Sequence, residues 1–86
     1  MKTYRVRISD GKRTVEKEVT ASRDSLNAAI DRMFRNKKHR EELVRTFLIG
    51  EATIDVIDTD TYEVVGDGKF TTNVFAGRSE YSVKLY

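Results

Sequence analysis

The sequence predicts an α+β domain in which an antiparallel or mixed β-sheet has helices packed on one face. Three observations predict this class. Apolar and polar residues alternate near both ends of the chain, apolar residues recur at helical spacing in the middle, and glycines separate the segments. The predicted order is two strands, a helical segment that breaks into two helices, and four strands, some of them short. The 86 residues are enough for one domain, spanning 1–86.

The first two strands form a hairpin. Apolar residues alternate with arginines over residues 4–8, and Asp10-Gly11 follows as a dipeptide suited to a tight turn. A two-residue loop there predicts two cross-strand pairs, Val6 with Val15 and Arg5 with Glu16. Lys17 then falls on the buried face opposite Tyr4, so its ammonium group has to reach past the edge of the core.

The middle of the chain predicts helices, because two apolar stripes with helical spacing flank residues 35–42, which contain no apolar side chain. The stripes are Leu26, Ala29, Ile30, Met33 and Phe34, and then Leu43, Val44, Phe47 and Leu48. Possible caps of the first helix are Ser22, Asp24 and Ser25. We expect two helices broken near Asn36, which tolerates the left-handed conformation, and a stop at Gly50. A single helix that bulges off the sheet is the alternative.

The remaining residues predict short strands. Alternation over residues 52–56 predicts one strand, and a loop at 59–61 places its last residue opposite Val64. We expect a turn at Gly66-Asp67-Gly68 and a final hairpin closed by Gly77-Arg78. That hairpin pairs three sets of residues on one face: Val74 with Tyr81, Thr72 with Val83, and Phe70 with Leu85.

The formal net charge of +2 conceals an asymmetry along the chain. Residues 1–50 contain 13 Lys and Arg against 7 Asp and Glu, whereas residues 51–86 contain 3 against 7. The stretch 51–67 has six acids and no Lys or Arg. This split predicts either a polarised surface or two halves that pair with each other across the sheet.

Groups capable of catalysis are scarce. The chain has no Cys and one His, His39, which lies among basic residues and is interpreted as a solvated surface side chain. Phosphate-binding loops, nucleophile elbows and zinc-binding HExxH motifs are absent. The acids Asp55, Asp58, Asp60 and Glu63 fit turn chemistry better than a catalytic carboxylate pair, and no EF-hand register fits them. We therefore expect a protein that is not an enzyme, with no catalytic residue, metal or cofactor.

Nothing in the sequence points to a membrane or to export. No apolar run has the length of a spanning helix, and the first residues lack the apolar core of a signal peptide. Together with the absence of cysteine, these features favour a cytoplasmic location.

Five basic residues within residues 32–40 form the strongest candidate binding site. They are Arg32, Arg35, Lys37, Lys38 and Arg40. If the helix breaks near Asn36, several of them project from the junction and can bind a phosphate backbone or an acidic protein surface. The alternative is a solvated helix face, partly neutralised by Glu41 and Glu42.

Two aromatic residues, Phe75 and Tyr86, form a second candidate site. Because side chains alternate between the two faces of a strand, both are expected on the face opposite to the apolar residues of the final hairpin. They are exposed anchors for a protein partner if that face of the sheet is open, or core residues if the twisted sheet brings them under the helices. The mixed charges on the outer face of the first hairpin suit cross-strand pairing instead.

Residues 3–34 resemble the opening of a β-grasp domain, since a strand, a tight glycine turn, a strand rich in Glu and Val and a capped helix follow one another. This resemblance implies a binding module that uses its sheet face and holds no cofactor. The whole chain is similar in style to small α+β proteins of phages and mobile elements, including anti-CRISPR proteins. That likeness implies inhibition by occupying a surface of a host complex.

The sequence thus predicts a small binding protein, in one form a phage-encoded inhibitor that occupies a surface of a host protein or nucleoprotein complex. The expected contacts are the basic residues of 32–40 together with Phe75 and Tyr86. The alternative function is direct binding of DNA or RNA through the basic residues. The protein is expected to be a monomer or a homodimer.

Overall fold

The computed structural model describes residues 1–86 and contains five strands and two helices. In chain order they are β1 (Lys2–Ser9), β2 (Thr14–Ala21), α1 (Leu26–Arg35), α2 (Lys37–Phe47), β3 (Ile49–Asp58), β4 (Val64–Asn73) and β5 (Arg78–Leu85). The predicted α+β class is confirmed. Three strands rather than four follow the helices, because two of the predicted short strands are one continuous strand, β4.

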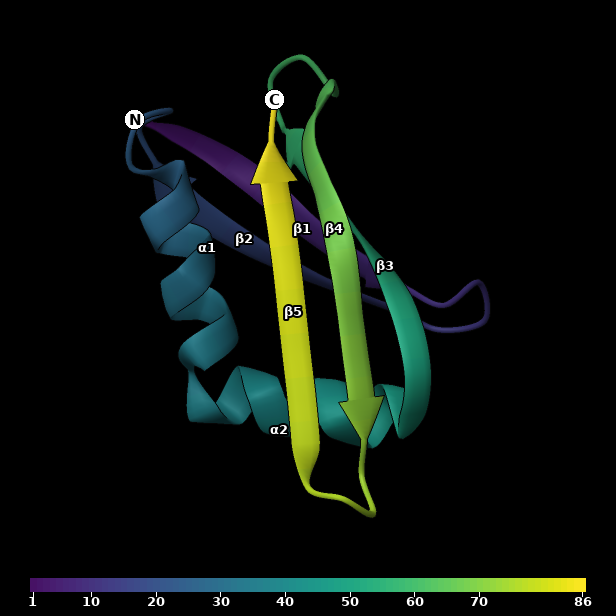
Figure 1. Cartoon of the computed structure of the whole chain (residues 1–86). Helices are drawn as coiled ribbons and strands as arrows, with labels where there is room; N and C mark the ends of the chain where they lie inside the picture. Colours follow the sequence, from purple (N-terminus) through teal and green to yellow (C-terminus); the bar gives the residue numbers. More distant parts are fainter.

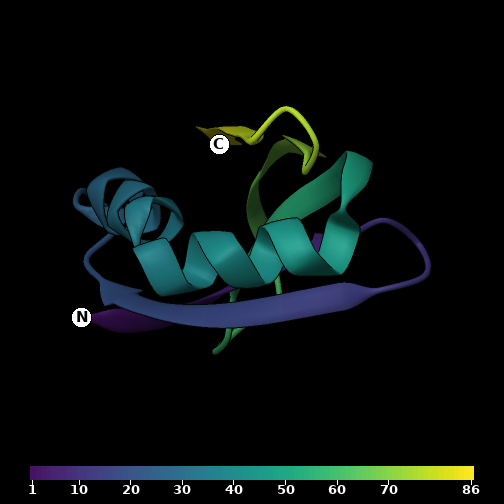
Figure 2. The same cartoon turned by 90° about the horizontal axis from the view of Figure 1, so that it is seen from below.

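The strands form one sheet in the order β2-β1-β3-β4-β5, and every neighbouring pair is antiparallel. Both helices lie on the same face, with α1 along the sheet and α2 across its lower end (Figure 1). Seen from below, the sheet curls around the helices, so the two edge strands β2 and β5 lie on opposite sides of them (Figure 2). The helix-covered face therefore contains the core, and the outer face is open.

The predicted pairing of the first hairpin is wrong by two residues. Val6 lies opposite Lys17 rather than Val15, because the loop contains four residues, Asp10–Arg13, instead of two. Asp10 organises this loop: its carboxylate accepts the backbone N–H groups of Lys12 and Arg13 at 2.9 and 2.8 Å. A shift of two preserves which face each residue occupies, so Lys17 still points to the helix side, where its ammonium group lies 2.8 Å from Glu42.

The predicted turn at Gly66-Asp67-Gly68 is wrong, because these residues lie inside β4. Val56 of β3 faces Gly66, and a β-bulge next to this pair brings Ile57 opposite Val64. The last hairpin is shifted by four residues from the prediction. Phe70 pairs with Tyr81 and not with Leu85, since the loop spans residues 74–77.

A continuous core of buried side chains joins the helices to the sheet. Its members are Tyr4, Val6, Ile8, Ala21, Leu26, Ala29, Ile30, Met33, Phe34, Leu43, Phe47, Ala52, Ile54, Val56 and Phe70. Phe34 of α1 is central to it, because its ring stacks on Tyr81 of β5 at 4.3 Å between centroids and faces Phe70 of β4 at 6.3 Å. This stack fastens the last two strands to α1.

The predicted break near Asn36 is confirmed, but its cause is different. Asn36 is extended, with φ −62° and ψ 125°, and is not left-handed. Its side-chain oxygen accepts the backbone N–H groups of Lys38 and His39 at 3.0 and 3.2 Å, so Asn36 caps the start of α2. Of the predicted caps of α1, Ser25 occupies the N-cap position, but its side chain makes no capping hydrogen bond to the helix. It exchanges hydrogen bonds with Ser22 through hydroxyl and backbone groups instead.

An Asn36→Ala variant is expected to lose about 1 kcal/mol of stability, because two N–H groups at the start of α2 lose their acceptor. In a domain of this size, that loss lowers Tm by roughly 4–8 °C. Thermal unfolding followed by circular dichroism measures it. Asn36→Asp keeps an acceptor and should unfold close to the wild-type temperature; an equal loss in both variants would contradict the capping role.

Candidate binding surface

The five predicted basic residues all lie exposed around the junction of the two helices. Arg32 and Arg35 end α1, and Lys37, Lys38 and Arg40 occupy the first turns of α2. The break at Asn36 brings them to one corner of the molecule. We call these five residues the corner cluster.

Most of the corner cluster has no acidic partner. Arg35 pairs with Asp31 one turn earlier in α1, at 2.9 Å, and that pair is exposed to solvent. The other four cations form no ion pair, and no acid occupies the first turn of α2. Lysines at a helix start oppose the positive end of the helix dipole, so their placement does not serve the stability of α2.

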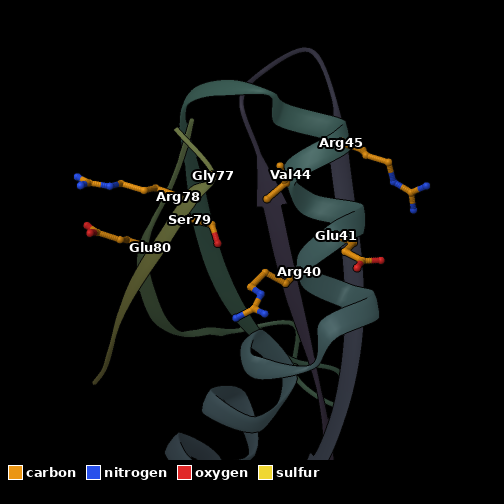
Figure 3. A pocket seen from close by; sticks show the side chains of 8 residues that line it. All are labelled: Arg40, Glu41, Val44, Arg45, Gly77, Arg78, Ser79 and Glu80. Atoms are coloured by element: carbon orange, nitrogen blue, oxygen red, sulfur yellow. The ribbon is translucent and has the colours of Figure 1, made fainter. Parts of the chain in front are cut away.

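A groove of about 700 Å³ runs between α2 and the start of β5. Arg40 points into it, with Val44 and Ser79 beside it, whereas Arg45, Arg78 and Glu80 point away (Figure 3). Only one of the three arginines that line the groove is therefore aimed at its interior. The groove is a channel beside the corner cluster and lacks the converging cations of a built phosphate site.

A second, apolar surface lies at the lower end of the molecule, where α2 passes into β3 and the β4–β5 loop turns back (Figure 1). Four large side chains are exposed there: Leu48, Ile49, Val74 and Phe75. They line one shallow groove of about 590 Å³. The backbone N–H of Val74 donates to the carbonyl of Leu48 at 2.9 Å, which joins the two segments. We call these four residues the end patch.

The end patch has a basic rim. Lys12 and Arg13, from the β1–β2 loop, line the same groove. Arg13 donates to the carbonyl of Thr46 at 3.0 Å, which holds the loop against α2. Asp10 is the one acid in this groove, and the N–H groups of Arg13 and Lys12 hold its pKa below the usual value.

The end patch includes a strained residue. Leu48 has φ 58° and ψ −78°, a conformation that costs a non-glycine residue about 1–3 kcal/mol. The prediction that Leu48 belongs to the buried stripe of α2 and that Gly50 stops the helix is wrong, because α2 ends at Phe47. The reversal of the chain at Leu48 turns its side chain out of the core, where it is 45% exposed.

The two predicted aromatic anchors are both exposed, but they are far apart. Phe75, 88% exposed, lies in the loop at the lower end, and its backbone N–H donates to the side chain of Asn73 at 3.1 Å. Tyr86, 67% exposed, follows the opposite end of β5, where partial desolvation of its hydroxyl group and the carboxylate of Asp67 raise its pKa. These residues cannot form one anchor, and Phe75 is a loop residue rather than part of the sheet face.

Few ion pairs join the two halves of the chain, although Arg7 of β1 lies opposite Asp55 of β3 in the sheet. Only one ion pair, Lys2 with Asp58 at 3.0 Å, connects residues 1–50 with residues 51–86. That pair raises the pKa of Lys2 and lowers the pKa of Asp58. On the outer face of β1 and β2, arginines pair with glutamates as predicted; the pairs are Arg5 with Glu16 and Glu18, and Arg7 with Glu16.

Asp58 and His39 both have hydrogen-bond partners within the fold. The carboxylate of Asp58 accepts the N–H of Asp60 at 2.9 Å, which is the predicted turn chemistry. His39 is half-buried rather than fully solvated, and its Nδ1 lies 3.2 Å from the carbonyl of Met33 at the end of α1. Burial and a hydrogen bond to Asp31 raise the pKa of Tyr81 to about 12. No group of three or more potential metal-ligating side chains converges.

Comparison with protein-family models, curated proteins and solved structures finds no match to this chain. Neither α1 nor α2 has the length and apolar character of a helix that crosses a membrane. The corner cluster and the end patch are the two surfaces of the molecule with features of a binding site.

Proposed function

We propose that the protein is a binding module whose end patch docks onto an acidic partner protein. The observation that carries this proposal is a contiguous set of four exposed apolar side chains. Most other large apolar side chains of the protein are buried or half-buried. Such patches are typical of protein-binding sites. The cations of the rim favour a partner whose surface is acidic around an apolar recess.

Phe75 is the anchor of this contact. Its ring projects from a loop at 88% exposure, so nearly all of its surface is available for burial by a partner. Aromatic side chains surrounded by polar groups contribute most of the affinity in many interfaces. The strained backbone of Leu48 supports the same interpretation, since strain of this kind concentrates at functional sites.

A phage-encoded inhibitor is the specific form of this function that the resemblance in sequence style suggests. Inhibition by occupying a surface needs no reacting group, only a shape and charge that fit the target. A host protein or nucleoprotein complex with an acidic protein surface is a suitable target for the end patch and its rim.

Replacement of Phe75 with alanine is expected to weaken the complex by about 2 kcal/mol, or roughly 30-fold in Kd. The immobilised protein is used to isolate its partner from cells, and Kd is then measured with the purified partner. Tyr62→Ala is the matched control, because Tyr62 is 75% exposed at the opposite end of the molecule. A larger loss from Tyr62→Ala than from Phe75→Ala would refute the end patch as the docking site.

Direct binding of nucleic acid is a second candidate function, favoured by the unpaired cations of the corner cluster. Fluorescence anisotropy with single-stranded and duplex oligonucleotides at two salt concentrations tests it. Binding that weakens steeply with salt and is lost on reversing the charge of Lys37 and Lys38 would support this function. Absence of binding at low salt would exclude it.

A further inference from the structure

The strand β5 is an open edge of the sheet. Its only strand neighbour is β4, and the N–H of Tyr86 donates to the carbonyl of Val65 on that strand at 2.9 Å. Since peptide groups alternate in direction along a strand, every second residue before Tyr86 also faces β4. The residues whose peptide groups face outward, with no strand partner, are Ser79, Tyr81, Val83 and Leu85.

The charges on this edge are symmetric about Ser82. Glu80 lies two residues before it and Lys84 two residues after it, both exposed on the outer face, and neither forms an ion pair within the chain. When two copies of β5 run antiparallel with Ser82 opposite Ser82, Glu80 of each copy faces Lys84 of the other. Both charge pairs are then attractive.

Neighbouring registers are less favourable. Pairing centred on Tyr81 places Arg78 opposite Lys84, and pairing centred on Glu80 places two glutamates against each other. Like charges directly opposite in a sheet are destabilising. Of the registers centred on residues 80–84, the one centred on Ser82 is the only one that places opposite charges against each other.

The inner side of the edge borders a groove of mixed polarity that has space for an added strand. Tyr81 and Val83 are half-buried, and they line this groove of about 490 Å³ together with Asp24 and with Asn27, Ala28, Ile30 and Asp31 of α1. In the register centred on Ser82, Tyr81 of one copy lies opposite Val83 of the other. Aromatic and β-branched pairs of this kind stabilise antiparallel sheets.

The other edge strand, β2, is not suited to pairing with a second copy of the chain. On β2, Lys17 points toward the helices and pairs with Glu42 at 2.8 Å, while Glu16 and Glu18 lie near arginines of β1. Pairing of two β2 strands about Lys17 would bring Glu16 opposite Glu18. An inward charge and like-charged neighbours are features that protect an edge strand from further pairing.

We infer that the protein forms a symmetric homodimer in which the β5 strands of two copies pair antiparallel about Ser82, giving one continuous sheet. The occupant of the β5 edge is thus a second copy of this chain. The end patch lies beside the start of β5, so the antiparallel arrangement places the two end patches at opposite ends of the dimer.

The test uses charge reversal and sedimentation equilibrium of the full chain up to millimolar concentration. Wild type is expected to dimerise. Glu80→Lys and Lys84→Glu each convert both attractive pairs into repulsive ones, so each variant alone is expected to dimerise at least about tenfold more weakly. An equimolar mixture of the two variants restores attraction at both pairs and is expected to form a heterodimer close to wild type in affinity.

Two further variants separate this interface from others. Val83→Pro removes an outward N–H while leaving the hydrogen bonds to β4 intact, so a folded monomer is expected, with folding checked by circular dichroism. Phe75→Ala should leave the dimer unchanged. A wild-type monomer at millimolar concentration, or a dimer lost with Phe75→Ala but kept by both charge variants and their mixture, would overturn the inference.

Discussion

A Gly68→Ala variant is expected to lose about 3 kcal/mol of stability or more, because the strand that follows crosses too close for any side chain. A Cβ atom at this position would lie 1.8 Å from the carbonyl oxygen of Ser82 and 2.9 Å from the Cα of Val83, both backbone atoms of β5. The two strands must separate to admit the methyl group, which removes hydrogen bonds and packing along the pair. Denaturation with urea measures the loss.

The expected change in stability is opposite in sign to that of an ordinary Gly→Ala substitution in a strand. Gly68 does not have a positive φ, and at such positions a Gly→Ala change usually stabilises a protein by about 0.4–1 kcal/mol. Gly77→Ala is the control: no atom lies within 4 Å of its added Cβ, and only its φ of 66° opposes the change. Its expected cost is about 1 kcal/mol. A neutral or stabilising Gly68→Ala would show that β5 does not approach β4 as described.

A Phe34→Ala variant is expected to lose about 3–5 kcal/mol, the range for removal of a buried aromatic ring. Phe34 is 4% exposed and lies between α1 and the last two strands, stacked on Tyr81 and facing Phe70. Domains of this length are stable by only about 4–13 kcal/mol, so the variant could lose most of its folded population. Urea denaturation at low temperature compares it with wild type.

The matched control for this position is Phe34→Leu, which keeps an apolar side chain but loses the stacked ring. It should lie between wild type and Phe34→Ala, at a loss of about 1–2 kcal/mol. Tyr81→Phe keeps the stack and removes only the hydroxyl that donates to Asp31, so a smaller loss is expected. If Phe34→Ala costs no more than Tyr81→Phe, the stack does not hold β5 to α1.

Periodicity in the sequence was sufficient to predict most of the fold. The alternation in β1 and the first helical stripe predicted which side chains are buried. The second stripe did so for Leu43 and Phe47 but not for Leu48, and the polar stretch between the stripes predicted the break at Asn36. These features depend on local patterns that one face of an element must satisfy. They do not depend on knowing which strands are neighbours.

The pairing of strands was harder to predict, because it depends on loop length. Both incorrect hairpins are displaced by an even number of residues, so the buried faces were correct while the partners were not. Asp10-Gly11 suggested a two-residue loop, but Asp10 caps a longer one through its carboxylate. Gly66 and Gly68 suggested a turn, although they are required by the close approach of β5.

The candidate site was only partly predictable. Exposure of the corner cluster followed from its position in the sequence, whereas exposure of Phe75 was one of two open alternatives. The end patch did not, because it depends on Leu48 leaving the helical stripe with a positive φ, and no local signal marks leucine for that conformation. The patch also combines segments near residues 48 and 75, which meet only after the sheet forms.

The most direct test of the binding surface is photo-crosslinking from two positions of the protein. A phenylalanine analogue bearing a benzophenone is introduced in place of Phe75 or, separately, of Tyr62, and each protein is irradiated in the cells or lysate that contain its target. The proposed docking mode predicts one dominant crosslinked protein from position 75, attached within a segment rich in Asp and Glu, and little crosslinking from position 62. Equal crosslinking from both positions, or dominant crosslinking from position 62, would contradict it.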